Sequence, residues 1–222
     1  MILLVAPSLE RAIRGSLGLD LRLAVAAQPL PAARLSIRER SRAAQLATPA
    51  RRIEWLTGRA ALKHLLAELG RNADTADITF PDARCSLTHS SGTAVAAGIQ
   101  RAGPRGVGVD LELRPGMDPR AARYFLTPTE RSCVGRAGIR QEAELLRLWT
   151  VKEALYKADP ENRGRVLGDY RLSEPARTCG HAAVGCGGRF RYASLAVPRG
   201  FLAVAVCLRG EPSCSMRIRS GC

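Results

Sequence analysis

The chain has 222 residues, with 34 lysines and arginines against 20 aspartates and glutamates, which gives a formal net charge of +14. This length allows one large domain or two smaller ones, and the 46% hydrophobic content can supply a buried core, which excludes wholesale disorder. No apolar segment approaches the roughly 20 residues that a membrane span needs. The apolar residues 2–5 meet Glu10 and Arg11 too early for a signal peptide, so we expect a cytoplasmic protein with no membrane partner.

The positive charge is spread along the chain, without a basic tail or a block of like charges. Only Lys63, Lys152 and Lys157 are lysines, and every other basic residue is an arginine. Diffuse positive charge favours acidic partners, which include phosphates, nucleic acid and acidic proteins. A solvated arginine-rich surface explains the same composition, so charge alone leaves the partner open.

The seven cysteines are an odd number and form no CxxC pair, which argues against a zinc ribbon or a disulfide framework. Cys179, His181 and Cys186 lie close in sequence but lack a second ligand pair. We interpret the cysteines as mostly buried thiols in a reducing compartment.

In the first half, residues 2–5 and 21–26 are predicted strands, and residues 36–47 have helical spacing. Thr48 and Pro49 are typical of a helix start, and this helix should run to about Leu69, where Gly70 ends it. Its predicted apolar face contains Ile53, Leu56, Ala60, Leu65 and Leu69. Predicted strands follow at residues 78–80, 84–88 and 93–99, the last two joined by a turn.

The breaker segment at residues 101–106 is the best internal boundary. Beyond it we expect a strand at residues 106–113, a helical segment at 118–124, a capping box from Thr127 to Glu130, and a long helix over 140–158. Further strands are predicted at residues 170–172, 190–197 and 201–208, with the last two forming a hairpin.

Each half therefore offers strands, a long helix and a closing hairpin, although no sequence repeat is visible. The expected fold class is α+β, with two similar subdomains that each pack an antiparallel sheet against a long helix. The predicted domains are residues 1–105 and residues 106–222, the second of which would carry a metal site.

Asp110 and Glu112 alternate on the strand at residues 106–113, so their side chains project from one face while Val107, Val109 and Leu111 line the other. Two neighbouring carboxylates on an apolar strand cost repulsion and desolvation unless a cation lies there. Oxygen ligands of this type suit Mg²⁺, which takes one or two carboxylates together with substrate phosphate. An edge strand whose carboxylates face water is the alternative explanation.

Glu153 and Lys157 share one face of the long helix, and Trp149 lies one turn before Glu153. A surface ion pair is the ordinary explanation. However, the chain keeps lysine here although it uses arginine almost everywhere else, which suggests that a compact ammonium with a tunable pKa matters.

Two further segments could bind anions. Residues 86–92 combine hydroxyls, turn N–H groups and His89, which could hold a phosphate. Arg52, Arg59 and Lys63 lie near one side of the first long helix, as an anion-binding stripe or as a wet face. The sequence contains no dinucleotide fingerprint, no phosphate-binding loop, no nucleophile elbow and no aromatic nucleic-acid platform.

Taken in order, these segments resemble the 4′-phosphopantetheinyl transferases, specifically the larger pseudo-dimeric type that activates peptide and polyketide synthases. The resemblance rests on Gly-Arg-Ala-Ala-Leu-Lys at residues 58–63, Ser-Leu-Thr-His-Ser at 86–90 and Gly-Val-Gly-Val-Asp-Leu-Glu at 106–112. Phe-Leu-Thr-Pro-Thr-Glu at 125–130 and Trp-Thr-Val-Lys-Glu-Ala-Leu-Tyr-Lys at 149–157 complete it.

The resemblance implies a monomer in which coenzyme A lies between two similar α+β halves. It implies that Mg²⁺ is the cofactor and that Asp110, Glu112 and Glu153 are its ligands. Lys157 would contact the pyrophosphate and assist the leaving group. Glu153 would be the base, directly or through a metal-bound water, with Glu130 as the second candidate. Coenzyme A binding is implied for a set of matching residues, with Arg42 as a weaker candidate: Arg52, Arg59, Thr88, His89, Asp110 and Lys157.

The reaction expected from the resemblance is transfer of the 4′-phosphopantetheine group from coenzyme A to a serine of an acyl or peptidyl carrier protein, with release of 3′,5′-adenosine bisphosphate. Acidic carrier proteins would suit the excess of arginine, and no nucleic acid is expected as a partner. The short segment at residues 77–84 lacks a Gly-Lys-Pro-like stretch that many relatives carry, and Arg84 could replace it. The alternative function is a non-enzymatic basic module that binds nucleic acid or an acidic protein.

Overall fold

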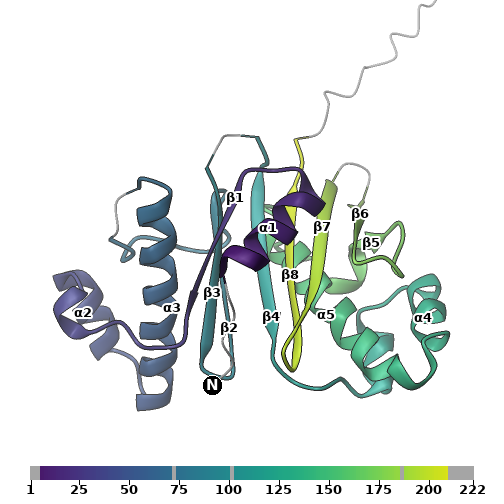
Figure 1. Ribbon diagram of the computed structural model, residues 1–222, viewed down its shortest axis with the longest axis horizontal. Helices are drawn as coiled ribbons and strands as arrows, with labels where there is room; N and C mark the ends of the chain where they lie inside the picture. The colour runs from purple at the N-terminus through teal and green to yellow at the C-terminus, as the bar shows by residue number, and fades with distance from the viewer. Residues whose placement is uncertain (1–5, 72–73, 101–102, 186–187, 210–222) are drawn as a thin grey trace, which may run out of the picture.

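The computed structural model describes residues 6–71, 74–100, 103–185 and 188–209, and the strand predicted at residues 2–5 lies outside them. Within these residues the strands form two antiparallel sheets, which confirms the α+β fold class (Figure 1). The three-stranded sheet has the order β1-β3-β2, and the five-stranded sheet has the order β4-β8-β7-β6-β5. The strands are β1 (Leu21–Ala26), β2 (Cys85–Ser90), β3 (Thr93–Ile99), β4 (Gly106–Glu112), β5 (Arg171–Leu172), β6 (Cys179–Val184), β7 (Gly188–Val197) and β8 (Gly200–Cys207).

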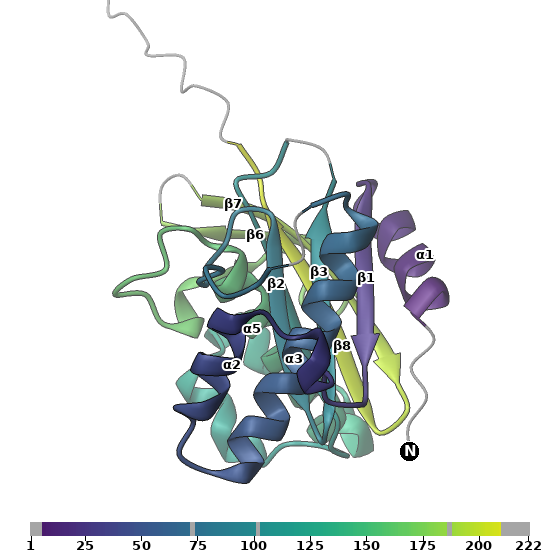
Figure 2. The ribbon, with the colours of Figure 1, turned by 90° about the vertical axis from the view of Figure 1, so that its left-hand side faces the viewer.

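The described helices pack on the sheets or on one another. They are α1 (Ala6–Leu17), α2 (Ile37–Ala44), α3 (Pro49–Glu68), α4 (Pro128–Gly135) and α5 (Gln141–Ala158). Helix α3 packs on the three-stranded sheet, and α5 packs on the five-stranded sheet (Figures 1 and 2). Helix α1 contacts both β1 and β7, and it covers a central core to which β1, β3, β4, β7 and β8 all contribute. No helix in the described part of the chain is long and apolar enough to cross a membrane.

The two sheets meet where β2 lies beside β4, and side-chain hydroxyls make this junction. Ser86, Thr88 and Ser90 alternate along β2, and their hydroxyls accept hydrogen bonds from the N–H groups of Val109, Leu111 and Leu113 at 3.0–3.3 Å. The residue offset is the same in all three bonds, so the two strands run in the same direction. The hydroxyls that the sequence offered as phosphate ligands therefore also hold the two sheets together.

The order of elements repeats. The first half has the element order β1, α2, α3 and the β2–β3 hairpin, and its strands form the sheet β1-β3-β2. The second half has the order β4, α4, α5 and the β7–β8 hairpin, and these strands form the equivalent arrangement β4-β8-β7. Strands β5 and β6 extend only the second sheet. The division into domains at residues 105 and 106 stays a prediction.

Each half also contains the same buried ion pair. In the first half, Glu39 closes a capping box with Ser36, accepts from the Thr75 N–H, and meets Lys63 Nζ of α3 at 3.0 Å. In the second half, Glu130 closes a capping box with Thr127, accepts from the Leu172 N–H, and meets Lys152 Nζ of α5 at 2.8 Å. Both carboxylates are fully buried, so each pair ties a short helix to the long helix of its own half.

Several predicted elements need correction. Residues 78–80 form no strand. The helical segment predicted at 118–124 is confirmed as a 3₁₀-helix, Pro119–Tyr124. Strand β6 lies in a glycine-rich segment that the hydrophobic pattern did not predict as a strand. Ile53 was assigned to the apolar face of α3 but is 55% exposed, whereas Thr57, Gly58, Ala61 and Leu65 are buried.

Helix α5 lies unusually close to β4 because two glycines face it. A Cβ added at Gly108 would lie 2.0 Å from the carbonyl oxygen of Ala154, and one added at Gly106 would lie 2.2 Å from that of Ala158. Both obstacles are backbone atoms, which no side-chain rotation can move. Only glycine at these positions allows the strand and the helix to approach this closely.

We expect Gly108→Ala to lower the free energy of unfolding by roughly 2–4 kcal/mol, because the added methyl group must push α5 away from the sheet. Urea denaturation followed by circular dichroism measures this change. Gly135→Ala is the matched control, since a Cβ there meets no atom within 4 Å. Equal stability of both variants would contradict the importance of this contact.

Candidate functional site

The close approach of α5 to β4 brings a lysine onto the buried carboxylate of β4. Asp110 is 5% exposed, and its Oδ1 accepts from Lys157 Nζ at 2.7 Å and from Thr88 Oγ1 at 3.1 Å. Its other oxygen, Oδ2, is buried and has no hydrogen-bond partner among the described residues. A buried, unpartnered carboxylate oxygen is costly, so this atom indicates a site for a cation or a donor.

Glu112 lies two residues further along β4, on the same side of the strand as Asp110 and opposite the central core. Trp149 Nε1 donates to its Oε1 at 3.1 Å, and Arg114 Nε lies 3.2 Å from its Oε2. Burial raises the pKa of Glu112, the Arg114 charge opposes this increase, and the Asp110 charge adds to it. The side chain is therefore held by an indole on one side and a guanidinium on the other.

Glu153 completes the acidic cluster from α5. Burial is the main cause that raises its pKa; Lys157 opposes the shift, and the charges of Asp110 and Glu112 reinforce it. Its carboxylate makes no hydrogen bond or ion pair within the described ranges. The three carboxylates thus act on one another electrostatically, and Glu153 is the one without a direct partner.

The donor chemistry of this cluster fits a hard divalent cation. The residues supply carboxylate oxygens, which Mg²⁺ prefers, and the unpartnered Oδ2 of Asp110 is one of them. As the side chains stand, no three Asp, Glu, His or Cys residues in the described part of the chain converge closely enough to hold a metal ion. Lys157 and Arg114 instead neutralise two of the three charges, so the metal site stays a prediction.

A cavity of about 390 Å³ opens beside Lys157. It is lined from both halves of the chain, by Phe80, Ser86, Tyr156, Lys157, Asn162 and Arg163. Arg163 adds a second cation to the one that Lys157 provides. This cavity therefore suits an anionic group that lies within reach of the acidic cluster.

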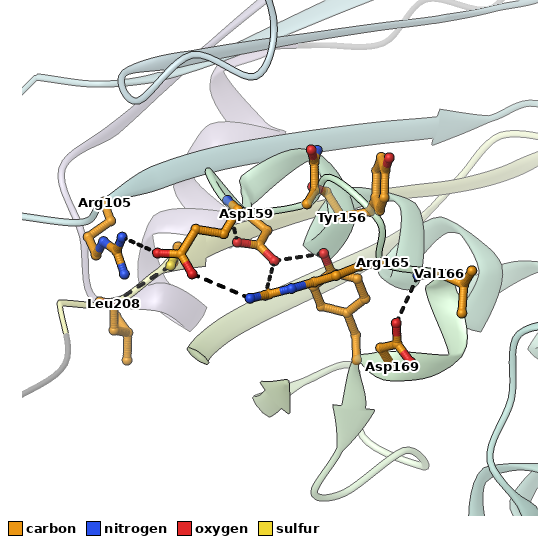
Figure 3. Close-up of polar contacts among 11 residues, drawn as sticks. Arg105, Tyr156, Asp159, Arg165, Val166, Asp169 and Leu208 are labelled. Carbon is orange, nitrogen blue, oxygen red and sulfur yellow. Dashed lines mark hydrogen bonds and ion pairs between the residues drawn. The ribbon is translucent and has the colours of Figure 1, made fainter. Parts of the chain in front are cut away.

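An ion-pair network holds the segment that carries Asn162 and Arg163. Asp159, at the end of α5, accepts from the Tyr170 hydroxyl at 2.8 Å and from Arg165 (Figure 3). Glu161 binds Arg105 at 2.6 Å through one oxygen and Arg165 at 3.4 Å through the other. The network anchors this loop to α5 and to the residue that precedes β4, which keeps the loop beside the cavity.

A second cavity, of about 510 Å³, adjoins the first, because Phe80 and Leu87 line both. Its other important lining residues come from α3 and β2 and include Arg51, Glu54, Trp55, Arg59 and His89. The Arg59 guanidinium lies 4.8 Å from the centre of the Trp55 ring and donates to the Thr75 carbonyl at 3.0 Å. Its Nε is buried without a partner among the described residues, and burial lowers its pKa. The two cavities form one path across β2 that is rich in cations.

The structure distributes the predicted coenzyme A ligands unequally along this path. Arg59, His89 and Lys157 line it, and Thr88 is buried against Asp110 instead. Three arginines line neither cavity. The Arg52 side chain donates to the Ala43 carbonyl and that of Arg42 to the Gln45 side chain, while Arg84 is exposed and its backbone N–H donates to Asp82. Arg51 and Arg163 are the cations found there instead, and composition alone could not single them out among 31 arginines.

Glu130 is fully engaged in the buried pair with Lys152. Its oxygens accept from Lys152 Nζ at 2.8 and 2.9 Å, from the Thr127 N–H at 2.8 Å and from the Leu172 N–H at 2.9 Å. A carboxylate with no free acceptor is not placed to take a proton from a substrate. Glu153 therefore remains the better candidate for the base.

The acidic cluster belongs to the second half alone. The β2–β3 and β7–β8 hairpins can be aligned from their turns, and in this alignment Ala96 of β3 corresponds to Ala203 of β8. Ala96 pairs with Ala24 of β1, and Ala203 pairs with Asp110 of β4, so Ala24 corresponds to Asp110. By the same alignment, Ala26 corresponds to Glu112. The repeat keeps the structural Glu–Lys pair in both halves but carries carboxylates at these strand positions in only one.

Comparison with known protein families gives a match within the second half of the chain. Residues 106–183 match the family model of the 4′-phosphopantetheinyl transferase superfamily. The match covers about a third of the chain and includes Asp110, Glu112, Glu153 and Lys157, so a domain of this superfamily is present. No curated protein matches the chain at a significant level. The superfamily match supports a transferase that acts on phosphopantetheine and thus, in general, coenzyme A and carrier proteins as its partners.

We expect Glu153→Gln to be more stable than the unmodified protein at about pH 7.5 and equally stable at about pH 4. The fold raises the pKa of Glu153 above its ordinary value of 4.5, so its charged form destabilises the folded state. This cost disappears once the carboxyl group is protonated, and glutamine mimics that state. Urea denaturation at the two pH values measures the difference.

Glu130→Gln is the contrasting variant in the same experiment. It leaves the buried Lys152 ammonium without its counter-charge, and we expect a loss of roughly 3 kcal/mol near neutral pH. If Glu153→Gln were the more destabilising of the two, the separation into a structural and a functional carboxylate would be wrong.

Proposed function

We propose that this protein is a Mg²⁺-dependent 4′-phosphopantetheinyl transferase that moves the phosphopantetheine arm of coenzyme A to a serine of an acyl or peptidyl carrier protein. The single observation that carries the proposal is the geometry around Asp110. A buried carboxylate with an unpartnered oxygen meets Lys157 at 2.7 Å, directly beside a cation-lined cavity. Carboxylates for a metal and cations for phosphates are thus adjacent, as phosphoryl transfer requires.

Coenzyme A has chemical parts that match the two adjoining cavities. We infer that its pyrophosphate lies in the cavity of Lys157 and Arg163, and that its phosphorylated adenosine end lies in the cavity of Trp55, Arg59 and His89. The aromatic and apolar walls of the second cavity suit a purine ring, and its cations suit a phosphate. The path runs across β2, between the two halves of the chain.

The reaction forms a bond between the serine oxygen and the β-phosphorus of coenzyme A, and it breaks the bond from that phosphorus to the bridging oxygen. The serine proton passes to the Glu153 carboxylate, which makes no hydrogen bond or ion pair within the described ranges and so keeps its oxygens free to accept it. The departing 3′,5′-adenosine bisphosphate carries the electron pair away, and Lys157 and Arg163 offset its growing negative charge. Thr88 and Trp149 act as positioning residues because they hold Asp110 and Glu112.

Asp110, Glu112 and Glu153 are the residues that would hold Mg²⁺. When bound, the ion would withdraw charge from the pyrophosphate oxygens and so make the phosphorus more open to attack. The orphaned Oδ2 of Asp110 supports this assignment, since it is an acceptor for which the described chain supplies no donor.

The repeated order of elements supports the larger, pseudo-dimeric type of transferase within the superfamily. A second half with the same sheet order and the same buried Glu–Lys pair lies on the other side of the proposed coenzyme A path. An acidic carrier protein is the partner we propose, since a net charge of +14 favours its approach.

Incubation of an apo carrier protein with this protein, coenzyme A and Mg²⁺ should add roughly 340 Da, the mass of the phosphopantetheine arm, and a chelator should abolish the addition. Intact-mass spectrometry measures it. We expect Glu153→Gln and Lys157→Met to lose at least about 100-fold in rate, since each removes a group that acts in the transition state.

Glu174→Gln is the control for this experiment, because Glu174 forms an exposed pair with Arg177 and lines neither cavity of the coenzyme A path. No mass gain with any of several carriers, together with no binding of coenzyme A by calorimetry, would exclude the proposed function.

Arg51 and Arg52 offer a matched pair of variants. Arg51 lines the larger cavity, whereas Arg52 reaches back to α2. We expect Arg51→Ala to raise the KM for coenzyme A by about five- to twentyfold with little change in kcat, since an exposed cation contributes binding in both ground and transition states. Arg52→Ala should change KM by less than about twofold, and the reverse order would show that the path of coenzyme A runs elsewhere.

A further inference from the structure

The coenzyme A path contains four permanent cations and a single carboxylate. Arg51, Arg59, Lys157 and Arg163 line the two cavities, and His89 adds an imidazole. Glu54 of α3 is the only acidic residue that lines either cavity within the described part of the chain. An acid in a cavity that otherwise suits phosphate is unexpected, because its charge repels the ligand.

The Glu54 carboxylate lies directly on the imidazole that faces the cavity. Its Oε1 is 2.8 Å from His89 Nδ1, and the two side chains are each about half exposed, at 49% and 50%. The pair joins the middle of α3 to the end of β2. Gly58, one turn after Glu54, lets these two elements approach, since a Cβ there would lie 3.1 Å from the Leu87 side chain.

A pair this exposed contributes little to the stability of the fold, so stability does not explain its position. The Glu54 carboxylate and a phosphate group both present anionic oxygens that can accept from the His89 imidazole. Glu54 occupies Nδ1 of His89, so a phosphate that binds this nitrogen must displace Glu54 from it. A ligand without that phosphate leaves the pair intact and avoids this cost.

We propose that Glu54 occupies, in the free protein, the site of the terminal phosphate of the ligand, and that its competition for His89 limits the preference for phosphorylated ligands. The proposal rests on the proposed function, because that function places the 3′-phosphate of coenzyme A in this cavity. Glu54 is thus a specificity-determining residue: it lowers the affinity for coenzyme A while leaving the affinity for dephospho-coenzyme A unchanged.

Isothermal calorimetry with the full chain tests this, with coenzyme A and dephospho-coenzyme A as the two probes. We expect Glu54→Gln to bind coenzyme A about three- to tenfold more tightly than the unmodified protein, with no change for dephospho-coenzyme A. Glu68→Gln is the matched control. Glu68 lies on the same helix and meets His64 at 3.4 Å, but neither residue lines the coenzyme A path. The Glu68→Gln variant removes the same charge from the protein and should leave the affinities for coenzyme A and dephospho-coenzyme A unchanged.

The other outcomes each overturn the proposal in a recognisable way. Glu54→Gln could raise the affinity for both ligands equally, or Glu68→Gln could raise the affinity for coenzyme A by the same factor. Either result would show that the loss of one negative charge from the protein explains the effect. Weaker binding of coenzyme A by Glu54→Gln would show that Glu54 supports His89 as a phosphate ligand rather than competing with the phosphate. If the unmodified protein bound neither ligand, the proposed function itself would fail, and this inference with it.

Discussion

The close packing of α5 against β4 sets the geometry of the candidate site. Gly106 and Gly108 have no Cβ, so the carbonyl oxygens of Ala154 and Ala158 can lie against the strand backbone. The next residues on the same side of β4 are Asp110 and Glu112, and the helix at this height presents Trp149, Glu153 and Lys157. The short distance between helix and strand makes possible the 2.7 Å contact of Lys157 with Asp110 and the 3.1 Å contact of Trp149 with Glu112. A wider separation would leave the same residues as unrelated surface charges.

The chain uses glutamate, aspartate and lysine in two different settings. Each half contains a fully buried glutamate that caps a short helix and binds a lysine of the long helix, and each pair is saturated with donors. These pairs account for two of the three lysines in the chain. The third, Lys157, instead binds a carboxylate that retains an unpartnered oxygen. In the first half, Ala24 and Ala26 occupy the positions that correspond to Asp110 and Glu112, so the repeat has kept the packing while only one half carries the acidic cluster.

Much of the fold could be predicted because local chemistry decides it. Thr48 and Thr127 cap α3 and α4 through their hydroxyls, proline follows each of them, and both helices begin where the sequence indicates. The alternation of Asp110 and Glu112 with Val109 and Leu111 correctly separates the two faces of β4. Ile53 was assigned wrongly: its spacing fits a helix face, but the residues of α3 in the core cluster with the sheet are Ala61, Leu62, Leu65 and Leu66, which lie further along the helix. Strand β6 was missed because Gly180 and the alanines around it carry little hydrophobic signal, and pairing with β7 forms the strand.

From the sequence alone, Asp110, Glu112, Glu153 and Lys157 can be named as candidate site residues, because their types, their spacing and the scarcity of lysine are all properties of the chain as written. Their surroundings depend on the tertiary structure. Arg51 rather than Arg52 lines the cavity because successive residues of α3 point about 100° apart, and the contact with β2 selects between them. The same packing placed Glu54 on His89 and buried Glu130 with Lys152, since contacts between distant segments depend on how helices and sheets meet, which no local pattern records.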